Sequence, residues 1–133
     1  MKKIAIFILV LSLPLLLSGQ DKKAAKNKLK SITVYEQDYV KGGGLLKESL
    51  VKYDEEGNIL EEIEYKQGKV LKHMVYQYDT QNNKIKEIEY DPAGKKIKVS
   101  EYKYTNNLRT EKAVYDANNK LLSKKTYKYE TYE

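Results

Sequence analysis

Apolar and polar residues alternate along most of this chain from about residue 32, and short polar stretches interrupt the alternation at regular distances. Alternation with a period of two, in segments rich in Tyr, Ile, Val, Leu and Thr, predicts β-strands. The strands are expected over residues 32–39, 45–53, 59–65, 70–78, 85–90, 97–104, 108–115 and 121–129. Because the connections are short, strands adjacent in sequence should pair antiparallel. The expected fold is all-β: an antiparallel β-meander of about eight strands, forming a twisted or curled single sheet with no helix after about Ser31.

The interruptions repeat one sequence unit that begins with tyrosine. Its full form is Tyr-Asp-x-x-Gly/Asn-x-x-Leu/Ile, and copies begin at Tyr53, Tyr78, Tyr90 and Tyr115. A copy without the Asp begins at Tyr39, and shorter variants begin at Tyr65 and Tyr104. Gly and Asn accept the positive φ of tight hairpin turns, so Gly57 and Gly94 are expected in that conformation. The Asp side chain can accept hydrogen bonds from backbone amides further along the turn.

Alternate units start at a nearly constant spacing along the chain. The starts at Tyr53, Tyr78, Tyr104 and Tyr129 are 25, 26 and 25 residues apart, the length of one hairpin with its connection. The units resemble the YD repeats of RHS-type secreted bacterial proteins over about residues 39–129. The resemblance implies a hairpin-repeat sheet and a location outside the cytoplasm. Proteins of that family are far longer and enclose a toxin domain, which eight strands cannot do.

The N-terminus is typical of a signal peptide. Two lysines are followed by an apolar run from Ile4 to Leu17 and by the small residues Ser18 and Gly19. This run is shorter than the roughly 20 residues that span a bilayer, so export to the periplasm or beyond, without a stable transmembrane anchor, is expected. The predicted organisation is a signal peptide over 1–19, a Lys-rich flexible arm over 20–31, and the repeat domain over 32–133.

Composition removes most catalytic chemistry. The formal net charge is +6, but seven of the 25 basic residues and one of the 19 acidic residues precede residue 32, which leaves 18 of each in the repeat domain. A nucleic-acid-binding domain would gather its basic residues in the folded part, so no nucleic-acid partner is expected. The chain has no Cys, and its one histidine, His73, cannot form a His-paired triad or a multi-His metal site. No catalytic residue, cofactor or metal site is predicted, and the protein is expected not to be an enzyme.

The 13 tyrosines are the feature with most functional promise. Counting alternate positions predicts one face lined by tyrosine and another that carries most Glu and Lys residues. Aromatic rows can contact proteins or stack on sugars, although packing alone also explains them. The predicted binding face comprises Tyr65, Tyr76, Tyr78, Tyr90, Tyr102 and Tyr104.

These features predict an exported, non-catalytic module that binds a protein or glycan in the cell envelope or outside the cell. The alternative is a small immunity or inhibitor protein that neutralises a secreted toxin. The two outermost strands of such a sheet leave backbone groups unpaired, so self-association through an edge strand is also open.

Overall fold

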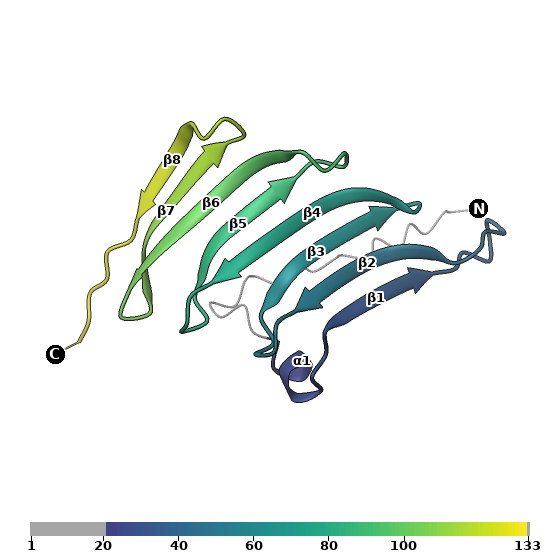
Figure 1. The fold of residues 1–133 in the computed structure, drawn as a ribbon, viewed down its shortest axis with the longest axis horizontal. Helices are drawn as coiled ribbons and strands as arrows, with labels where there is room; N and C mark the ends of the chain where they lie inside the picture. Colours follow the sequence, from purple (N-terminus) through teal and green to yellow (C-terminus); the bar gives the residue numbers. More distant parts are fainter. Residues whose placement is uncertain (1–20, 133) are drawn as a thin grey trace.

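The computed structural model describes residues 21–132, which form one open, eight-stranded antiparallel sheet preceded by a short helix (Figure 1). The strand order follows the sequence from β1 to β8, so the predicted meander is confirmed. Within the described residues no helix follows Ser31, as expected. The predicted signal peptide lies outside the described residues. The elements are α1 (Lys22–Lys26), β1 (Ser31–Glu36), β2 (Leu46–Tyr53), β3 (Ile59–Lys66), β4 (Lys69–Tyr78), β5 (Lys84–Tyr90), β6 (Lys96–Thr105), β7 (Leu108–Asp116) and β8 (Leu121–Thr126).

Six of the predicted strands agree with the structure to within one residue at each end, and the first and last end earlier than expected. The strand expected to reach Tyr39 ends at Glu36. Asp38 then accepts hydrogen bonds from the backbone N–H groups of Val40 and Lys41, which starts a turn. The positive φ in this loop belongs to Gly42 rather than to the fifth position of the unit. The last strand ends at Thr126 instead of Tyr129.

The four units with Asp close their turns in the predicted way. The Asp54 carboxylate accepts hydrogen bonds from the backbone N–H groups of Glu56 and Asn58, at 2.9 and 2.8 Å. Equivalent bonds to the turn backbone are made by the Asp that follows each of the other three tyrosines, namely Asp79, Asp91 and Asp116. The fifth position has positive φ in all four units, at Gly57, Asn82, Gly94 and Asn119. The expectation for Gly57 and Gly94 is therefore confirmed.

Every hairpin contains a β-bulge beside its turn. Tyr53 is opposite Ile59 and Lys52 is opposite Glu61, so Leu60 has no partner across the strand pair. The same shift occurs at the last tyrosine of the first strand in each of the other hairpins, which in the β1–β2 hairpin is Tyr35. In the four Asp-containing units the extra residue is the eighth, aliphatic position: Leu60, Ile85, Ile97 and Leu122. A bulge adds one residue to one strand and so breaks the strict alternation of faces at each turn.

The segment predicted as a flexible arm instead contains α1 and contacts the turn between β2 and β3. The Asp21 side chain caps α1 by accepting hydrogen bonds from the N–H groups of Lys23 and Ala24. The Asp21 N–H donates to the Gly57 carbonyl at 2.7 Å, and Ala24 is 1% exposed. Charge runs near chain ends are usually disordered. Here the capping Asp and the two alanines give the run a buried contact.

Asparagine side chains link the turns at the α1 end of the sheet. Asn58 donates a side-chain hydrogen bond to Asn82 in the next turn at 2.8 Å, and Asn83 donates one to Asn107 in the turn after that at 2.9 Å. Asn58 and Asn83 are both buried. A single-layer sheet has no second layer to pack against. These hydrogen bonds between hairpins therefore supply part of the stabilisation that a packed core gives in a layered fold.

Candidate functional site: the two faces of the sheet

Residues directly opposite each other on paired antiparallel strands project from the same face of the sheet. Glu62 is opposite Met74, and Met74 is opposite Glu89, whereas Val75 is opposite Ile88 and belongs to the other face. We call the face of Glu62, Met74 and Glu89 the tyrosine face, because most of the predicted tyrosines lie on it. The other is called the aliphatic face, and its central row is Val75, Ile88, Val99 and Tyr115.

The structure divides the six predicted tyrosines between both faces. Tyr76, Tyr78, Tyr102 and Tyr104 lie on the tyrosine face, as the register shows. Tyr90 is opposite His73 on the aliphatic face, and the two rings stack with centroids 5.0 Å apart. Tyr65 also lies on the aliphatic face, where its ring is 5.6 Å from Lys47 Nζ.

The predicted separation of tyrosines from charged residues is wrong. Tyr76 is opposite Glu87, and Tyr102 is opposite Lys112, so tyrosines and charges share one face. The cause is the bulge in each hairpin, because alternation counted through a turn is displaced by the extra residue.

The tyrosines at the α1 end form a hydrogen-bonded ladder. The Tyr78 hydroxyl donates to the Ile59 carbonyl at 2.7 Å, and the Tyr104 hydroxyl donates to the Lys84 carbonyl at 2.7 Å. Tyr129 repeats this contact with the Arg109 carbonyl at 2.6 Å. Each hydroxyl thus reaches the strand that follows the previous turn. We call this set the tyrosine ladder, and its hydroxyls serve the fold.

Tyr53, which precedes Tyr78 in this series, has no earlier hairpin of the same kind to contact. Its hydroxyl lies 3.2 Å from the Asp21 carboxylate, so α1 takes the place of the missing hairpin. Burial, together with the negative charge of Asp21 and the hydrogen bond to it, raises the pKa of Tyr53 to about 12. Repeat proteins need terminal caps of this kind, because an end repeat lacks one neighbour.

A stack of alternating cations and aromatic rings runs across the middle of the tyrosine face. Lys84 Nζ is 4.9 Å from the Tyr76 ring centroid and 5.9 Å from that of Tyr102. From β7, the neighbour of β6 opposite to β5, the Arg109 guanidinium lies 4.1 Å from the Tyr102 ring centroid and Lys112 Nζ lies 5.6 Å from it. Tyr102 is only 6% exposed, and three cations from the two neighbouring strands lie within 6 Å of its ring centroid.

Carboxylates anchor this stack. Glu87 forms an ion pair with Lys84, and both side chains are largely buried. Burial alone would raise the pKa of Glu87, but the hydrogen bond and charge of Lys84, with help from Tyr102 and Lys112, lower it. The Tyr76 hydroxyl donates to Glu62 at 2.6 Å. Burial and this hydrogen bond raise the pKa of Tyr76 well above its usual range, so the phenol stays neutral.

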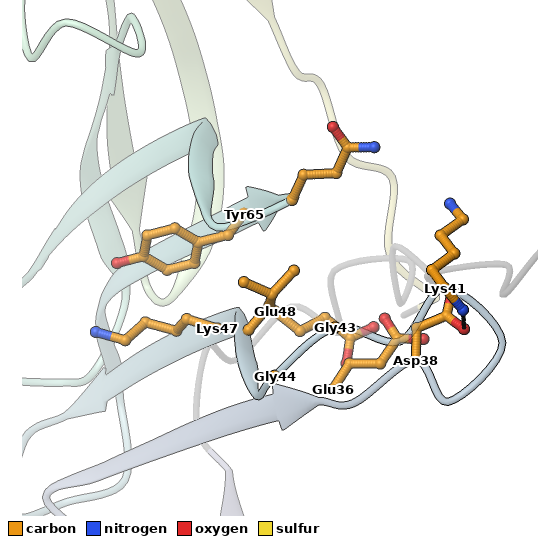
Figure 2. A pocket seen from close by; sticks show the side chains of 10 residues that line it. Glu36, Asp38, Lys41, Gly43, Gly44, Lys47, Glu48 and Tyr65 are labelled. Atoms are coloured by element: carbon orange, nitrogen blue, oxygen red, sulfur yellow. Dashed lines mark hydrogen bonds between the residues drawn. The ribbon is translucent and has the colours of Figure 1, made fainter.

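Two of the hollows among residues 21–132 are considered as ligand sites. The first, of about 360 Å³, lies beside the loop between β1 and β2 and is lined by Glu36, Asp38, Lys47, Glu48 and Tyr65 among others (Figure 2). The second, of about 310 Å³, lies on the tyrosine face beside the cation–aromatic stack. We call it the charged cleft, and its lining residues are Lys72, Met74, Glu87, Glu89, Lys98, Ser100 and Lys112.

His73 has a local partner on the aliphatic face. Its Nε2 atom lies 3.6 Å from Glu61, which also contacts Lys52 at 3.5 Å. Within residues 21–132, no three His, Asp or Glu side chains converge in a way that could hold a metal ion. No helix in this same range is long and apolar enough to cross a bilayer.

Sequence reasoning missed Lys84, Arg109 and Asp21, which hold the tyrosines in place. Lys84 and Arg109 are 25 residues apart and stand opposite Tyr78 and Tyr104, the turn-entry residues of two successive hairpins. The repeat spacing could therefore have identified the two cations as equivalent positions. Nothing in the local sequence indicates the contact of Asp21 with Tyr53, because it joins residues 32 positions apart.

No protein-family model and no curated protein matches this chain. Among solved structures, the chain is similar to one described as the crystal structure of TarM, with 13% sequence identity and a TM-score of 0.34. The match covers 77% of this chain and 24% of TarM, so the chain spans about a quarter of the length of that protein. A similarity this low carries no conclusion on function.

Proposed function

We propose that this chain is an exported, non-catalytic module that binds a protein partner on its tyrosine face, at the charged cleft. The observation that carries the proposal is that the tyrosines of that face are engaged within the fold, whereas the cleft beside them is open. The hydroxyls of Tyr78 and Tyr104 are held by backbone carbonyls, and the ring of Tyr102 is enclosed by cations. The cleft beside them is open and presents cationic, anionic and hydroxyl groups.

The enclosure of Tyr102 favours a protein partner over a glycan. A sugar ring stacks on an uncovered aromatic face, whereas Tyr102 is 6% exposed and has Lys84, Arg109 and Lys112 within 6 Å of its ring centroid. In the cleft, Met74 offers an apolar contact, and Lys98 and Glu89 form an ion pair at 3.2 Å that leaves Lys98 half exposed. Six of the seven lining residues are charged or polar, and charged groups of both signs make the cleft selective for a protein surface of complementary charge.

A matched pair of charge reversals tests the proposal. Lys98 lies on the tyrosine face and Lys124 on the aliphatic face; both side chains are 50% exposed, and each pairs with one Glu, at 3.2 and 3.6 Å. The mature protein and the variants Lys98→Glu and Lys124→Glu are immobilised, and partners from the envelope fraction and the medium are quantified by mass spectrometry. A partner lost with Lys98→Glu and retained with Lys124→Glu supports the proposal.

The other outcomes are equally informative. Loss with Lys124→Glu alone would assign binding to the aliphatic face. Retention on purified envelope glycan with no protein captured would identify a glycan-binding module. If the one dominant partner proved to be a secreted toxin, the module would be an inhibitor, and the cleft would be its contact site.

A further inference from the structure

The two edge strands of the sheet are protected very differently. β8 carries the adjacent lysines Lys124 and Lys125, and charged residues of this kind discourage pairing with another chain. β1 has no charged residue from Ser31 to Tyr35, and among residues 21–132 it pairs only with β2 (Figure 1). Ile32, Val34 and Tyr35 of β1 are 38%, 39% and 55% exposed. An uncharged, exposed edge strand is a template for a further strand.

We propose that β1 pairs antiparallel with β1 of a second copy of this chain, so that the two sheets join across a two-fold axis. In such a pairing opposite residues must share a face, and the two-fold axis makes each contact occur twice. The uncharged run from residue 31 to 35 is centred on Thr33, which places Thr33 opposite Thr33 of the second copy. Ile32 then faces Val34, and both belong to the tyrosine face because they are opposite Val51 and Ser49 of β2.

The charges that flank the run favour this partner and this register. Lys30 precedes the run and Glu36 ends it, and both residues are exposed. With Thr33 on the axis, Lys30 of each copy faces Glu36 of the other, which gives two cross-strand pairs of opposite charge. Shifting the centre to Val34 would instead place Ile32 against Glu36.

Alternative pairings are less well matched. Two β8 strands pairing with each other would bring lysines close to lysines. Pairing β1 with β8 of the next copy leaves an edge free on each end and would give an open filament rather than a closed pair. A contact of six residues on each side is small, so the dimer should be concentration-dependent.

The test is the oligomeric state of the mature protein, measured by sedimentation equilibrium from about 10 µM to about 1 mM. The wild-type chain is expected to dimerise over this range. Thr33→Lys places two positive charges on the axis and should keep the protein monomeric. Thr126→Lys makes the same exchange on β8 and should leave the dimer intact. Circular dichroism establishes that the variants keep the sheet.

A charge-swap cycle checks the register and does not depend on Thr33. Lys30→Glu and Glu36→Lys should each weaken the dimer by roughly 10-fold or more, because like charges then face each other. The double variant restores opposite charges and should restore dimerisation. A wild-type chain that stays monomeric at about 1 mM would overturn the proposal, and so would filaments, or a dimer sensitive to Thr126→Lys and insensitive to Thr33→Lys.

Discussion

The contact between α1 and the first Asp-containing turn predicts unequal costs for two glycines at the same repeat position. Gly57 and Gly94 both have positive φ, 82° and 88°. A Cβ atom at residue 94 would meet nothing within 4 Å, so Gly94→Ala adds backbone strain alone. That strain costs about 1 kcal/mol of the free energy of unfolding.

Gly57→Ala adds a steric conflict with α1. Its Cβ would lie 2.5 Å from the Asp21 carbonyl oxygen and 2.9 Å from the Ala25 Cβ atom, so α1 must move away. The hydrogen bond from the Asp21 N–H to Gly57 is then lost, at about 1 kcal/mol. Exposing Ala24 costs about 1 kcal/mol more. The total for Gly57→Ala is about 3 kcal/mol, against about 1 kcal/mol for Gly94→Ala.

Urea unfolding followed by far-ultraviolet circular dichroism measures both costs. The control is Ala24→Asp, which puts a charge at a position that is 1% exposed and should release α1 from the turn. In that background the two glycine substitutions should cost the same. Equal costs in the wild-type background would refute the steric role assigned to α1.

Two further predictions concern tyrosine hydroxyls. Tyr78→Phe and Tyr104→Phe each remove a hydrogen bond to a backbone carbonyl and should lower the free energy of unfolding by about 1 kcal/mol. Tyr39 is 83% exposed, so Tyr39→Phe should leave the free energy of unfolding unchanged in the same urea assay. The pKa of Tyr53 is about 12 in the folded protein, so the phenol loses its proton at a lower pH in the unfolded chain. The contribution of Tyr53 to the free energy of unfolding is therefore fully present below about pH 10 and decreases between about pH 10 and 12. Urea midpoints over this pH range should show the fall, and Tyr53→Phe should reduce it; an identical pH profile for the variant would contradict the assignment.

The strands could be predicted because their turn signals are local. Each Asp and the Gly or Asn that follows it act within five residues, so Asp54 and Gly57 mark their turn whatever surrounds them. The faces could not be predicted by counting, because an unpaired residue such as Leu60 or Ile85 displaces the alternation at every turn. The unpaired position is aliphatic in every full unit. The sequence shows this regularity but does not show that a bulge leaves the residue unpaired.

The same geometry decides on which face each of the predicted tyrosines lies. Tyr76, Tyr78, Tyr102 and Tyr104 do share a face, since they come from the corresponding ends of β4 and β6. Tyr65 and Tyr90 lead into turns at the other end and lie on the other face. The enclosure of Tyr102 depends on Lys84 and Arg109 from two other strands, and no local pattern around Tyr102 shows that.

The tyrosine ladder makes the molecule a one-dimensional assembly. Each hydroxyl joins a hairpin only to the one before it, so the energy of the array is a sum of nearest-neighbour terms. Unfolding can then begin at β8 and stop at any hairpin boundary, while α1 caps the first hydroxyl of the ladder, that of Tyr53. It also follows that one period of about 25 residues can be removed from or added to the middle of the array without leaving a hydroxyl unmatched, because the neighbours on either side present the same groups.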